Sequence, residues 1–389
     1  MRRVILIVMD GCGVGALPDA AGYGEYDPAS ATVPHVSMAV GGLKLPALEK
    51  IGFGCVAPIL GLAATGASGA WGRSAIASTG KDSLTGHWEM MGIITEKAYP
   101  TYPNGFPPEV ITAFERVTGR KALGNRAASG TDIIRELGEE HVRTGNPIVY
   151  TSVDSVFQIA AHESVIPLDD QYALCAKVRE TLIAPNNVQR VIARPFTGDN
   201  PATYKRTNHR RDFPLQPPPH NMLRFLKEAG VAVHGIGVVA DLFPGDLFSR
   251  AERTQTNAES LAAIKKAVET GTEQFVFANC EDFDMLYGHR NDVQGFARAL
   301  TEFDAALAEI VAALRPDDLL ILTADHGNDP TMPGTDHTRE YVPVLATGSC
   351  VRRNAGVLGR SALADVAATV GVWLEVDWRG IGRPLEIFI

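Results

Sequence analysis

The chain has 389 residues, of which 45% are hydrophobic and 21% charged, which is the balance of a soluble globular protein. This length suffices for two domains, or for one large domain with an insertion. The formal net charge of −9 argues against a nucleic-acid binder, which would usually be basic.

Neither a secretion signal nor a membrane span is predicted. The apolar run 4–9 ends at Asp10 and is too short for the core of a signal peptide. The uncharged stretch 51–72 contains six glycines, a composition typical of loops. Five scattered cysteines without a CxxC motif are typical of reduced thiols. We therefore expect a cytoplasmic protein with no membrane partner.

Predicted strands and helices alternate along the second half of the chain. A strand is also predicted at the start, over residues 4–9. Thr256 and Glu259 fit a capping box that opens a helix. The predicted helices cover 222–229, 256–271 and 296–314, and the predicted strands cover 231–234, 274–278, 319–323 and 342–346. This alternation predicts an α/β fold with helices on both faces of the sheet.

Two proline clusters, at 100–108 and 214–219, interrupt the pattern. Prolines break helices and favour extended linkers. The residues between the clusters carry strand and helix signals of their own. We therefore predict a core formed by residues 1–97 and 220–389, with a smaller α/β cap domain, residues 98–219, inserted into it.

Acidic and imidazole side chains follow the predicted strands. Parallel strands collect ligand-binding residues at their carboxyl ends, so we expect these side chains at one edge of the sheet. Carboxylate and imidazole ligands together suit Mn²⁺, Zn²⁺ or Fe²⁺ better than Ca²⁺, and six ligands are enough for two ions. Taken singly, such residues could instead be helix caps or solvated loop residues. The set is Asp10, Asp284, His289, Asp325, His326 and His337.

A segment of small and hydroxyl-bearing residues, 79–88, offers a candidate nucleophile. A hydroxyl held between two metal ions loses its proton readily and can attack phosphorus. Ser83 and Thr85 are both candidates. The alternative is a turn with a helix cap at Asp82 or Ser83.

Residues 11–16 superficially match the GxGxxA pattern of dinucleotide-binding folds. Pro18 falls where the following helix should continue, and no second strand ending in an acidic residue follows at the expected distance. An aspartate before a glycine turn suits a metal ligand better. A basic segment, 187–212, holds six basic and two acidic side chains. It is either a phosphate-binding surface, since arginine forks match phosphate oxygens, or a solvated loop.

The chain resembles the bacterial phosphopentomutases of the alkaline phosphatase superfamily over nearly its whole length. The resemblance rests on GKDSLTGHWEMMG, ASGTDIIRELGEEH, YTSVDSVFQIAAHE, VIARPF, DFDMLYGHR and TADHGNDPTMPGTDHTREYVPVL. It implies an alkaline-phosphatase-like core with a mostly parallel sheet flanked by helices. It also implies an isomerase that interconverts ribose 1-phosphate, or 2-deoxyribose 1-phosphate, and the 5-phosphate.

The resemblance also implies roles for individual residues. It makes Ser83 the nucleophile, in the place of a threonine that is phosphorylated in the family. One Mn²⁺ would be held by Asp10, Asp325 and His326, and a second by Asp284, His289 and His337. A sugar 1,5- or 1,6-bisphosphate would act as activator. The residues that match the family's substrate contacts are Ser152, Asp154, Arg194, Arg206 and, as a weaker match, Arg210.

Two positions depart from the family pattern. Val238 stands where a lysine usually helps to bind the substrate phosphate, and Gly11 follows Asp10 where the family has serine. These departures leave open a phosphomutase for a different sugar phosphate. A di-metal phosphohydrolase, a non-catalytic binding module and a dinucleotide-dependent oxidoreductase are further alternatives. We expect a small-molecule sugar phosphate as the partner, no nucleic acid, and a monomer or weak oligomer.

Overall fold

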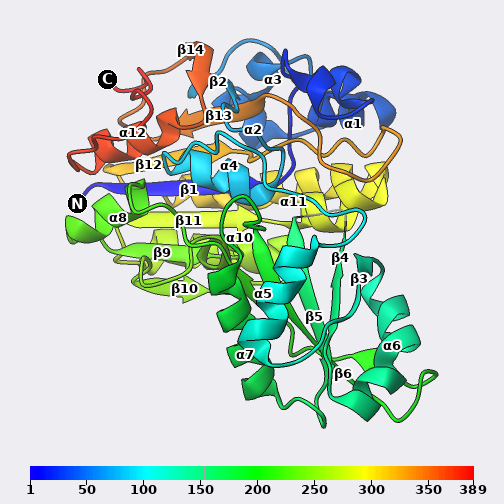
Figure 1. Ribbon diagram of the computed structural model, residues 1–389. Coiled ribbons are helices and arrows are strands. Elements are labelled where there is room, and N and C mark those ends of the chain that lie inside the picture. Colours follow the sequence, from blue (N-terminus) through cyan, green and yellow to red (C-terminus); the bar gives the residue numbers. More distant parts are fainter. Residues whose placement is uncertain (153–154) are drawn as a thin grey trace. The chain divides into compact units, whose positions relative to one another are not determined.

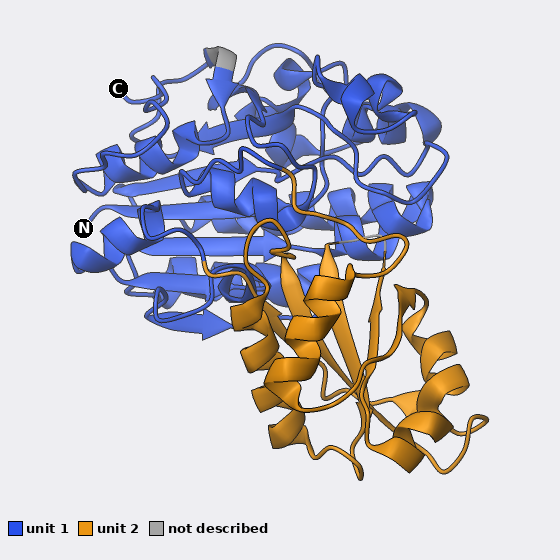
Figure 2. Cartoon of the chain, viewed as in Figure 1, with its two compact units in different colours: residues 1–97, 217–389 blue, residues 98–216 orange. Residues whose placement is uncertain are grey.

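The computed structural model describes residues 1–152 and 155–389. The chain divides into two compact units, residues 1–97 with 217–389 and residues 98–216 (Figure 2). The first boundary lies just before Pro100, and the second falls within the proline cluster at 214–219. Among the described residues, no helix is long and apolar enough to cross a membrane.

The first unit is built on an eight-stranded sheet (Figure 1). β13 runs antiparallel to both of its neighbours, β12 and β2, and the other neighbouring strands pair in parallel. In spatial order the strands are β10 (Arg250–Glu252), β9 (Val233–Ile236), β11 (Phe275–Cys280), β1 (Arg3–Met9), β12 (Asp318–Thr323), β13 (Val342–Thr347), β2 (Ala70–Ala75) and β14 (Ala355–Ala362).

Helices cover both faces of this sheet. Every residue of β1 is buried, which requires cover on each side. Helix α12 contacts both α8 and α4, and α11 contacts α1, α2 and α10. The helices are α1 (Thr32–Ala39), α2 (Pro46–Ile51), α3 (Phe53–Val56), α4 (Ser83–Met90), α8 (Met222–Glu228), α9 (Val239–Leu242), α10 (Asn257–Thr270), α11 (Val293–Ala312) and α12 (Asp365–Trp373).

Local signals in the sequence set most of these boundaries, with two differences. The strand predicted at 231–234 forms at Val233–Ile236, because the amide of Val231 donates to Leu226 and still belongs to the end of α8. The capping box is half formed. Thr256 accepts from the amide of Glu259 at 3.2 Å, but the Glu259 carboxylate accepts from Gln255 rather than from Thr256.

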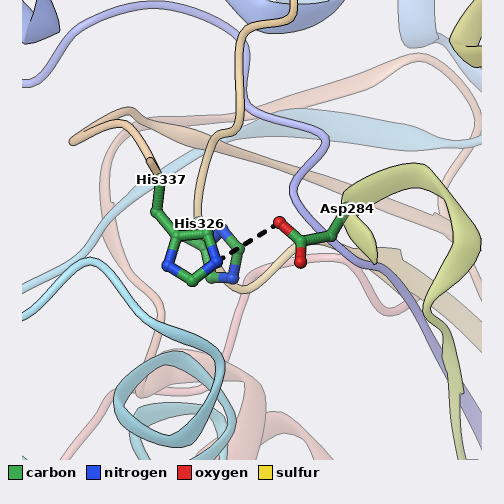
Figure 3. Close-up of side chains that lie close together, drawn as sticks. All are labelled: Asp284, His326 and His337. Carbon is green, nitrogen blue, oxygen red and sulfur yellow. Dashed lines mark ion pairs between the residues drawn. The ribbon is translucent and has the colours of Figure 1, made fainter. Parts of the chain in front are cut away.

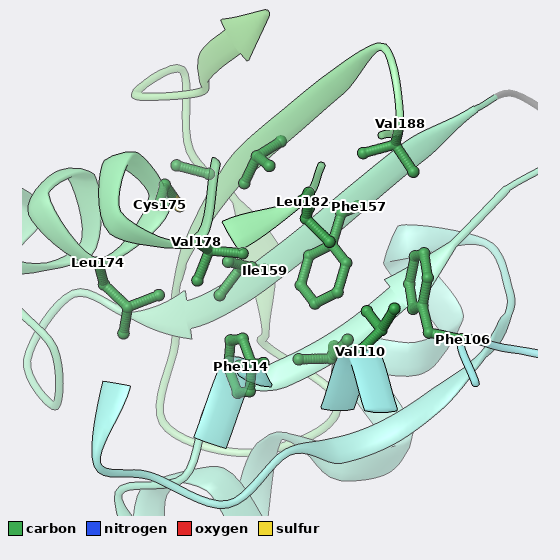
Figure 4. Close-up of a cluster of buried hydrophobic side chains, with 13 residues drawn as sticks. Phe106, Val110, Phe114, Phe157, Ile159, Leu174, Cys175, Val178, Leu182 and Val188 are labelled. Carbon is green, nitrogen blue, oxygen red and sulfur yellow. The ribbon is translucent and has the colours of Figure 1, made fainter. Parts of the chain in front are cut away.

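The second unit has its own sheet and its own apolar core. Its helices α5 (Pro108–Thr118) and α7 (Leu168–Thr181) enclose the buried cluster drawn in Figure 4, which includes Phe106, Phe114, Phe157 and Val178. A separate cluster beneath α6 (Gly130–Thr144) includes Ile133 and Phe196. The strands are β3 (Leu123–Ala127), β4 (Ile148–Thr151), β5 (Val156–His162), β6 (Arg190–Thr197), β7 (Lys205–Arg206) and β8 (Arg211–Pro214).

Candidate metal centre

Three parallel strands of the first unit end at one edge of the sheet and deliver acidic and imidazole side chains there. β1 lies between β11 and β12 in parallel register. Asp10 follows β1 directly, and Asp325 and His326 follow β12. Asp284 lies in a π-helical turn, Phe283–Tyr287, shortly after β11. The strand ends therefore carry the candidate ligands to one place, as their positions in the sequence predict.

Asp10, Asp325 and His326 form one group. Nε2 of His326 lies 3.4 Å from Oδ1 of Asp10 and 3.4 Å from Oδ2 of Asp325. All three residues are almost completely buried. Their ligand atoms lie within 4.8 Å of one another, a spacing that one metal ion could bridge.

A second group gathers around Asp284. One carboxylate oxygen of Asp284 lies 3.1 Å from Nε2 of His289, and the other lies 3.3 Å from Nε2 of His337. Figure 3 shows the His326 and His337 rings close together and facing Asp284, and the two ring centroids are 4.0 Å apart. The ligand atoms of Asp284, His326 and His337 also lie within 4.8 Å of one another, so His326 belongs to both candidate groups and the two candidate ion positions adjoin.

The tautomers of two imidazoles suit ligands of a cation. Nδ1 of His326 lies 3.1 Å from the carbonyl oxygen of Gly327, and Nδ1 of His289 lies 2.5 Å from that of Thr335. A carbonyl oxygen can only accept, so each Nδ1 carries a proton and Nε2 is the nitrogen that a metal ion would take. In both cases Nε2 faces a carboxylate oxygen, and a proton or a metal ion between the two atoms would satisfy both.

The pKa shifts within the cluster fit a site that holds positive charge among buried carboxylates. Burial and the nearby carboxylates of Asp325 and Asp284 raise the pKa of Asp10. Burial opposes ionisation of Asp325, but His326 and His87 outweigh it and lower the pKa of Asp325 to about 2. Burial likewise opposes the charged form of His337, yet Asp284 raises the pKa of His337 to about 9.

Three atoms of the cluster are buried and have no hydrogen-bond partner among the described residues. They are Oδ1 of Asp10, Oδ2 of Asp325 and Nε2 of His337. Buried polar atoms are normally satisfied, and these three are of the types that bind divalent transition-metal ions. The residues therefore fit a divalent metal ion.

Ser83 is the hydroxyl that the fold places against this cluster. It is the first residue of α4, and its Oγ lies 3.1 Å from Nε2 of His326. Asp82 caps the helix by accepting from both the amide and the hydroxyl of Thr85, at 3.1 and 2.8 Å. The Thr85 hydroxyl therefore donates its proton to the carboxylate of the cap residue, Asp82. Of the two candidates open in the sequence, Ser83 is the one whose hydroxyl lies against the candidate ligands.

Glycine at position 86 lets α4 approach the strand end. A Cβ atom there would collide with the backbone carbonyl of Asp325. The helix can therefore lie directly against the residue that follows β12, which brings Ser83 to His326. A side chain at this position would move α4, and with it Ser83, away from His326.

Two asparagines support the ligands, and sequence reasoning missed both. Asn279 donates to Oδ2 of Asp10 and Asn328 donates to Oδ1 of Asp284, each at 2.7 Å. Such hydrogen bonds orient ligating carboxylates. Asn279 lies at the end of β11, so the rule of strand ends could have found it. Asn328, two residues after His326, had no such signal.

Adjacent buried residues, Arg339 and Glu340, tie the loops of the centre together. The Arg339 guanidinium donates to the carbonyls of Ile76, Ser78 and Gly80, just before Ser83. The Glu340 carboxylate accepts from the amide of Gly15 and from the amide and hydroxyl of Thr32, at 2.7 to 3.0 Å. It also accepts from the hydroxyl of Thr338 at 2.7 Å. The pair joins the segment before α4 to the loop after β1.

Residues 11–19 contain no helix, so the turn after β1 lacks the helix that a dinucleotide-binding fold requires.

Val238 is the residue before α9, on the turn after β9.

The second unit gathers the arginines of the basic segment around Tyr150. Burial raises the pKa of Tyr150, while the charges of Arg194, Arg206 and Arg210 oppose that rise. Arg194 donates to Gln158 at 3.0 Å, and Arg210 makes two 2.7 Å hydrogen bonds to Asp212. Ser152 is half-buried after β4, whereas Asp154 lies outside the described residues.

Comparison with known proteins places these features in a family. The model of the metalloenzyme superfamily matches residues 2–377. The phosphopentomutase of Caldanaerobacter subterraneus subsp. tengcongensis is 52% identical, with 95% of this chain and 93% of that protein covered. The phosphopentomutase of Carboxydothermus hydrogenoformans is 51% identical, with 95% of each chain covered. The chain belongs to the phosphopentomutase family.

Membership of this family makes the protein an isomerase of the phosphotransferase type that uses a divalent metal ion, as expected from the resemblance. Solved structures show the same fold at low sequence identity. PH0037 of Pyrococcus horikoshii matches with a TM-score of 0.51 and 17% identity over 96% of this chain and 97% of that one. Phosphoglycerate mutase of Leishmania mexicana matches with a TM-score of 0.50 and 15% identity over 99% and 98%. These matches and the mostly parallel sheet confirm the predicted α/β fold class.

Proposed function

We propose that the protein interconverts ribose 1-phosphate, or 2-deoxyribose 1-phosphate, and the 5-phosphate through a phosphorylated Ser83. The observation that carries this proposal is the position of the Ser83 hydroxyl, 3.1 Å from His326, the residue shared by both candidate ligand groups. Family membership supports the pentose phosphate as substrate, because the relatives are named phosphopentomutases.

Two Mn²⁺ ions would occupy the cluster. Mixed oxygen and nitrogen donors favour Mn²⁺ over Ca²⁺. One ion would be held by Asp10, Asp325 and His326, and the other by Asp284, His289 and His337. When bound, the ions neutralise charge on the phosphoryl oxygens and stabilise the alkoxide form of Ser83.

In the first step, the free hydroxyl of the pentose phosphate attacks the phosphorus of phosphoserine 83. The bond between phosphorus and the Ser83 oxygen breaks as the new bond forms, the proton of the sugar hydroxyl passes in net terms to the departing Ser83 oxygen, and the sugar becomes a 1,5-bisphosphate. In the second step, the Ser83 oxygen attacks the other phosphate of this bisphosphate. Phosphoserine is regenerated and the isomeric monophosphate is released. A 1,5- or 1,6-bisphosphate in trace amounts would phosphorylate Ser83 initially and act as activator.

Residues of the second unit would bind the sugar and the phosphate that is not being transferred. The arginines around Tyr150 supply charge-assisted hydrogen bonds that match phosphate oxygens. Ser152 and Asp154 would contact the sugar hydroxyls. The substrate-binding set is Ser152, Asp154, Arg194, Arg206 and Arg210.

A coupled assay tests the proposal. Purified protein is incubated with ribose 1-phosphate, Mn²⁺ and a catalytic amount of ribose 1,5-bisphosphate, and ribose 5-phosphate is measured alongside inorganic phosphate. The proposal predicts ribose 5-phosphate with little free phosphate. Release of inorganic phosphate without the isomer would instead identify a phosphohydrolase. A panel of hexose phosphates under the same conditions tests whether this protein, which has Val238 in place of the family's lysine, prefers a different sugar phosphate.

A further inference from the structure

His87 lies one helical turn after Ser83 on the same face of α4. Residues four apart on a helix are neighbours, so the imidazole is directed toward the turn that carries the nucleophile. The His87 side chain is completely buried, and its ring centroid lies 5.8 Å from that of Phe277 on β11. Neither the resemblance nor the strand-end pattern assigns a role to this residue.

A single nitrogen of His87 contacts both the nucleophile residue and a ligand residue. Nδ1 lies 2.8 Å from the backbone carbonyl oxygen of Ser83 and 3.3 Å from Oδ2 of Asp325. The carbonyl can only accept, so Nδ1 carries the proton and donates it. The positive edge of this N–H group also faces the Asp325 oxygen.

The two oxygens of Asp325 have different surroundings. Oδ1 accepts from the amides of Gly11 and His326, at 3.1 and 3.2 Å. Oδ2 has no hydrogen bond of good geometry among the described residues, and its nearest nitrogens are those of His87 and His326. His87 therefore stands beside the Asp325 oxygen that remains available to a metal ion.

We propose that His87 is a positioning residue that fixes Ser83 and Asp325 relative to each other. The imidazole holds the first carbonyl of α4 and orients the free oxygen of Asp325 toward the ion. The inference rests on the proposed metal centre but not on the identity of the sugar. Residues that orient ligating side chains typically change metal affinity 10- to 100-fold when removed, so the role is measurable without any substrate.

Three variants separate positioning from simple packing. His87→Asn keeps an N–H donor at the same number of bonds from the backbone as Nδ1. His87→Leu keeps an apolar side chain of similar size and removes the donor. His234→Leu is the matched control, because His234 is equally buried in the same unit, on β9, and touches none of the candidate ligands.

The measurement is Mn²⁺ binding by isothermal titration to metal-free protein, with Co²⁺ absorption spectra as a second readout of ligand geometry. Thermal unfolding and circular dichroism establish that each variant is folded. We expect His87→Leu to bind one ion about 10- to 100-fold more weakly and with an altered Co²⁺ spectrum. His87→Asn should recover most of that loss, and His234→Leu should bind both ions as the unmodified chain does.

A folded His87→Leu variant with unchanged affinity and an unchanged Co²⁺ spectrum would overturn the positioning role and leave the metal centre standing. Equal losses in His87→Leu and His234→Leu would also overturn it, since packing alone would then explain both. If the unmodified chain bound no divalent ion, both the positioning role and the proposed metal centre would be wrong.

Discussion

The hydroxyl oxygen of Ser83 lies 3.1 Å from Nε2 of His326, and because Nδ1 of that ring faces a carbonyl, the hydroxyl donates to Nε2. The same Nε2 lone pair is the one that a metal ion would take. A metal ion held by His326 would therefore take the place of the Ser83 hydrogen bond at this nitrogen and would favour the deprotonated form of the hydroxyl.

Replacing Ser83 with alanine should lower mutase turnover by at least about a thousandfold, since the residue that forms the covalent intermediate would be lost. Mn²⁺ binding should remain within a few fold, because six side-chain ligands are untouched. Thr85→Val is the matched control, with a hydroxyl that serves only the helix cap. Normal turnover in Ser83→Ala together with loss in Thr85→Val would show that the nucleophile is misassigned.

Metal affinity should rise with pH between 7 and 9. In the metal-free chain Asp284 raises the pKa of His337 to about 9, so its Nε2 is protonated at neutral pH and must release that proton to bind an ion. The same raised pKa stabilises the metal-free fold below the unfolded value of about 6.5, and this contribution is lost as pH rises through about 9. Titrations in buffers of different ionisation enthalpy will count the protons released. Affinity independent of pH would contradict the prediction, and His337→Gln should flatten the slope.

Gly86→Ala should impair the enzyme through geometry alone. The added methyl group meets the carbonyl of Asp325 and forces α4 away from the strand end. A displacement of about 1 Å at a reacting centre can cost about 100-fold in kcat/KM. Gly22→Ala is the control, because a Cβ there meets nothing within 4 Å and its backbone is not strained. Assays of both variants, with unfolding curves, test the prediction, and equal kcat/KM values would contradict it.

Arg206→Ala should raise the KM for the pentose phosphate about 10- to 100-fold, the range expected for a lost charge-assisted hydrogen bond. Arg210→Ala should have a smaller effect, since two 2.7 Å hydrogen bonds already commit Arg210 to Asp212. Arg143→Ala, an exposed change on α6, is the control. Steady-state kinetics with ribose 1-phosphate will rank the three, and a larger effect for Arg210 than for Arg206 would contradict the assignment.

The alternation of strands and helices predicted the fold class, and the candidate ligands were chosen because they follow the predicted strands. Each of β1, β11 and β12 is a buried apolar run followed within a few residues by an acidic side chain. The reversed direction of β13 was not predictable, since an apolar strand reads alike in either orientation. The contacts of His87 with Asp325 and of Glu340 with Thr32 were also hidden, because these residues lie far apart along the chain.

Because Arg339 and Glu340 together hold several loops of the centre, these loops should open together. The two residues are neighbours in the chain. Arg339 binds the segment that leads into α4, and Glu340 binds the turn after β1 and Thr32. Local opening at any of these segments must break contacts to the same dipeptide, so amide protons across them should exchange with solvent together rather than one by one.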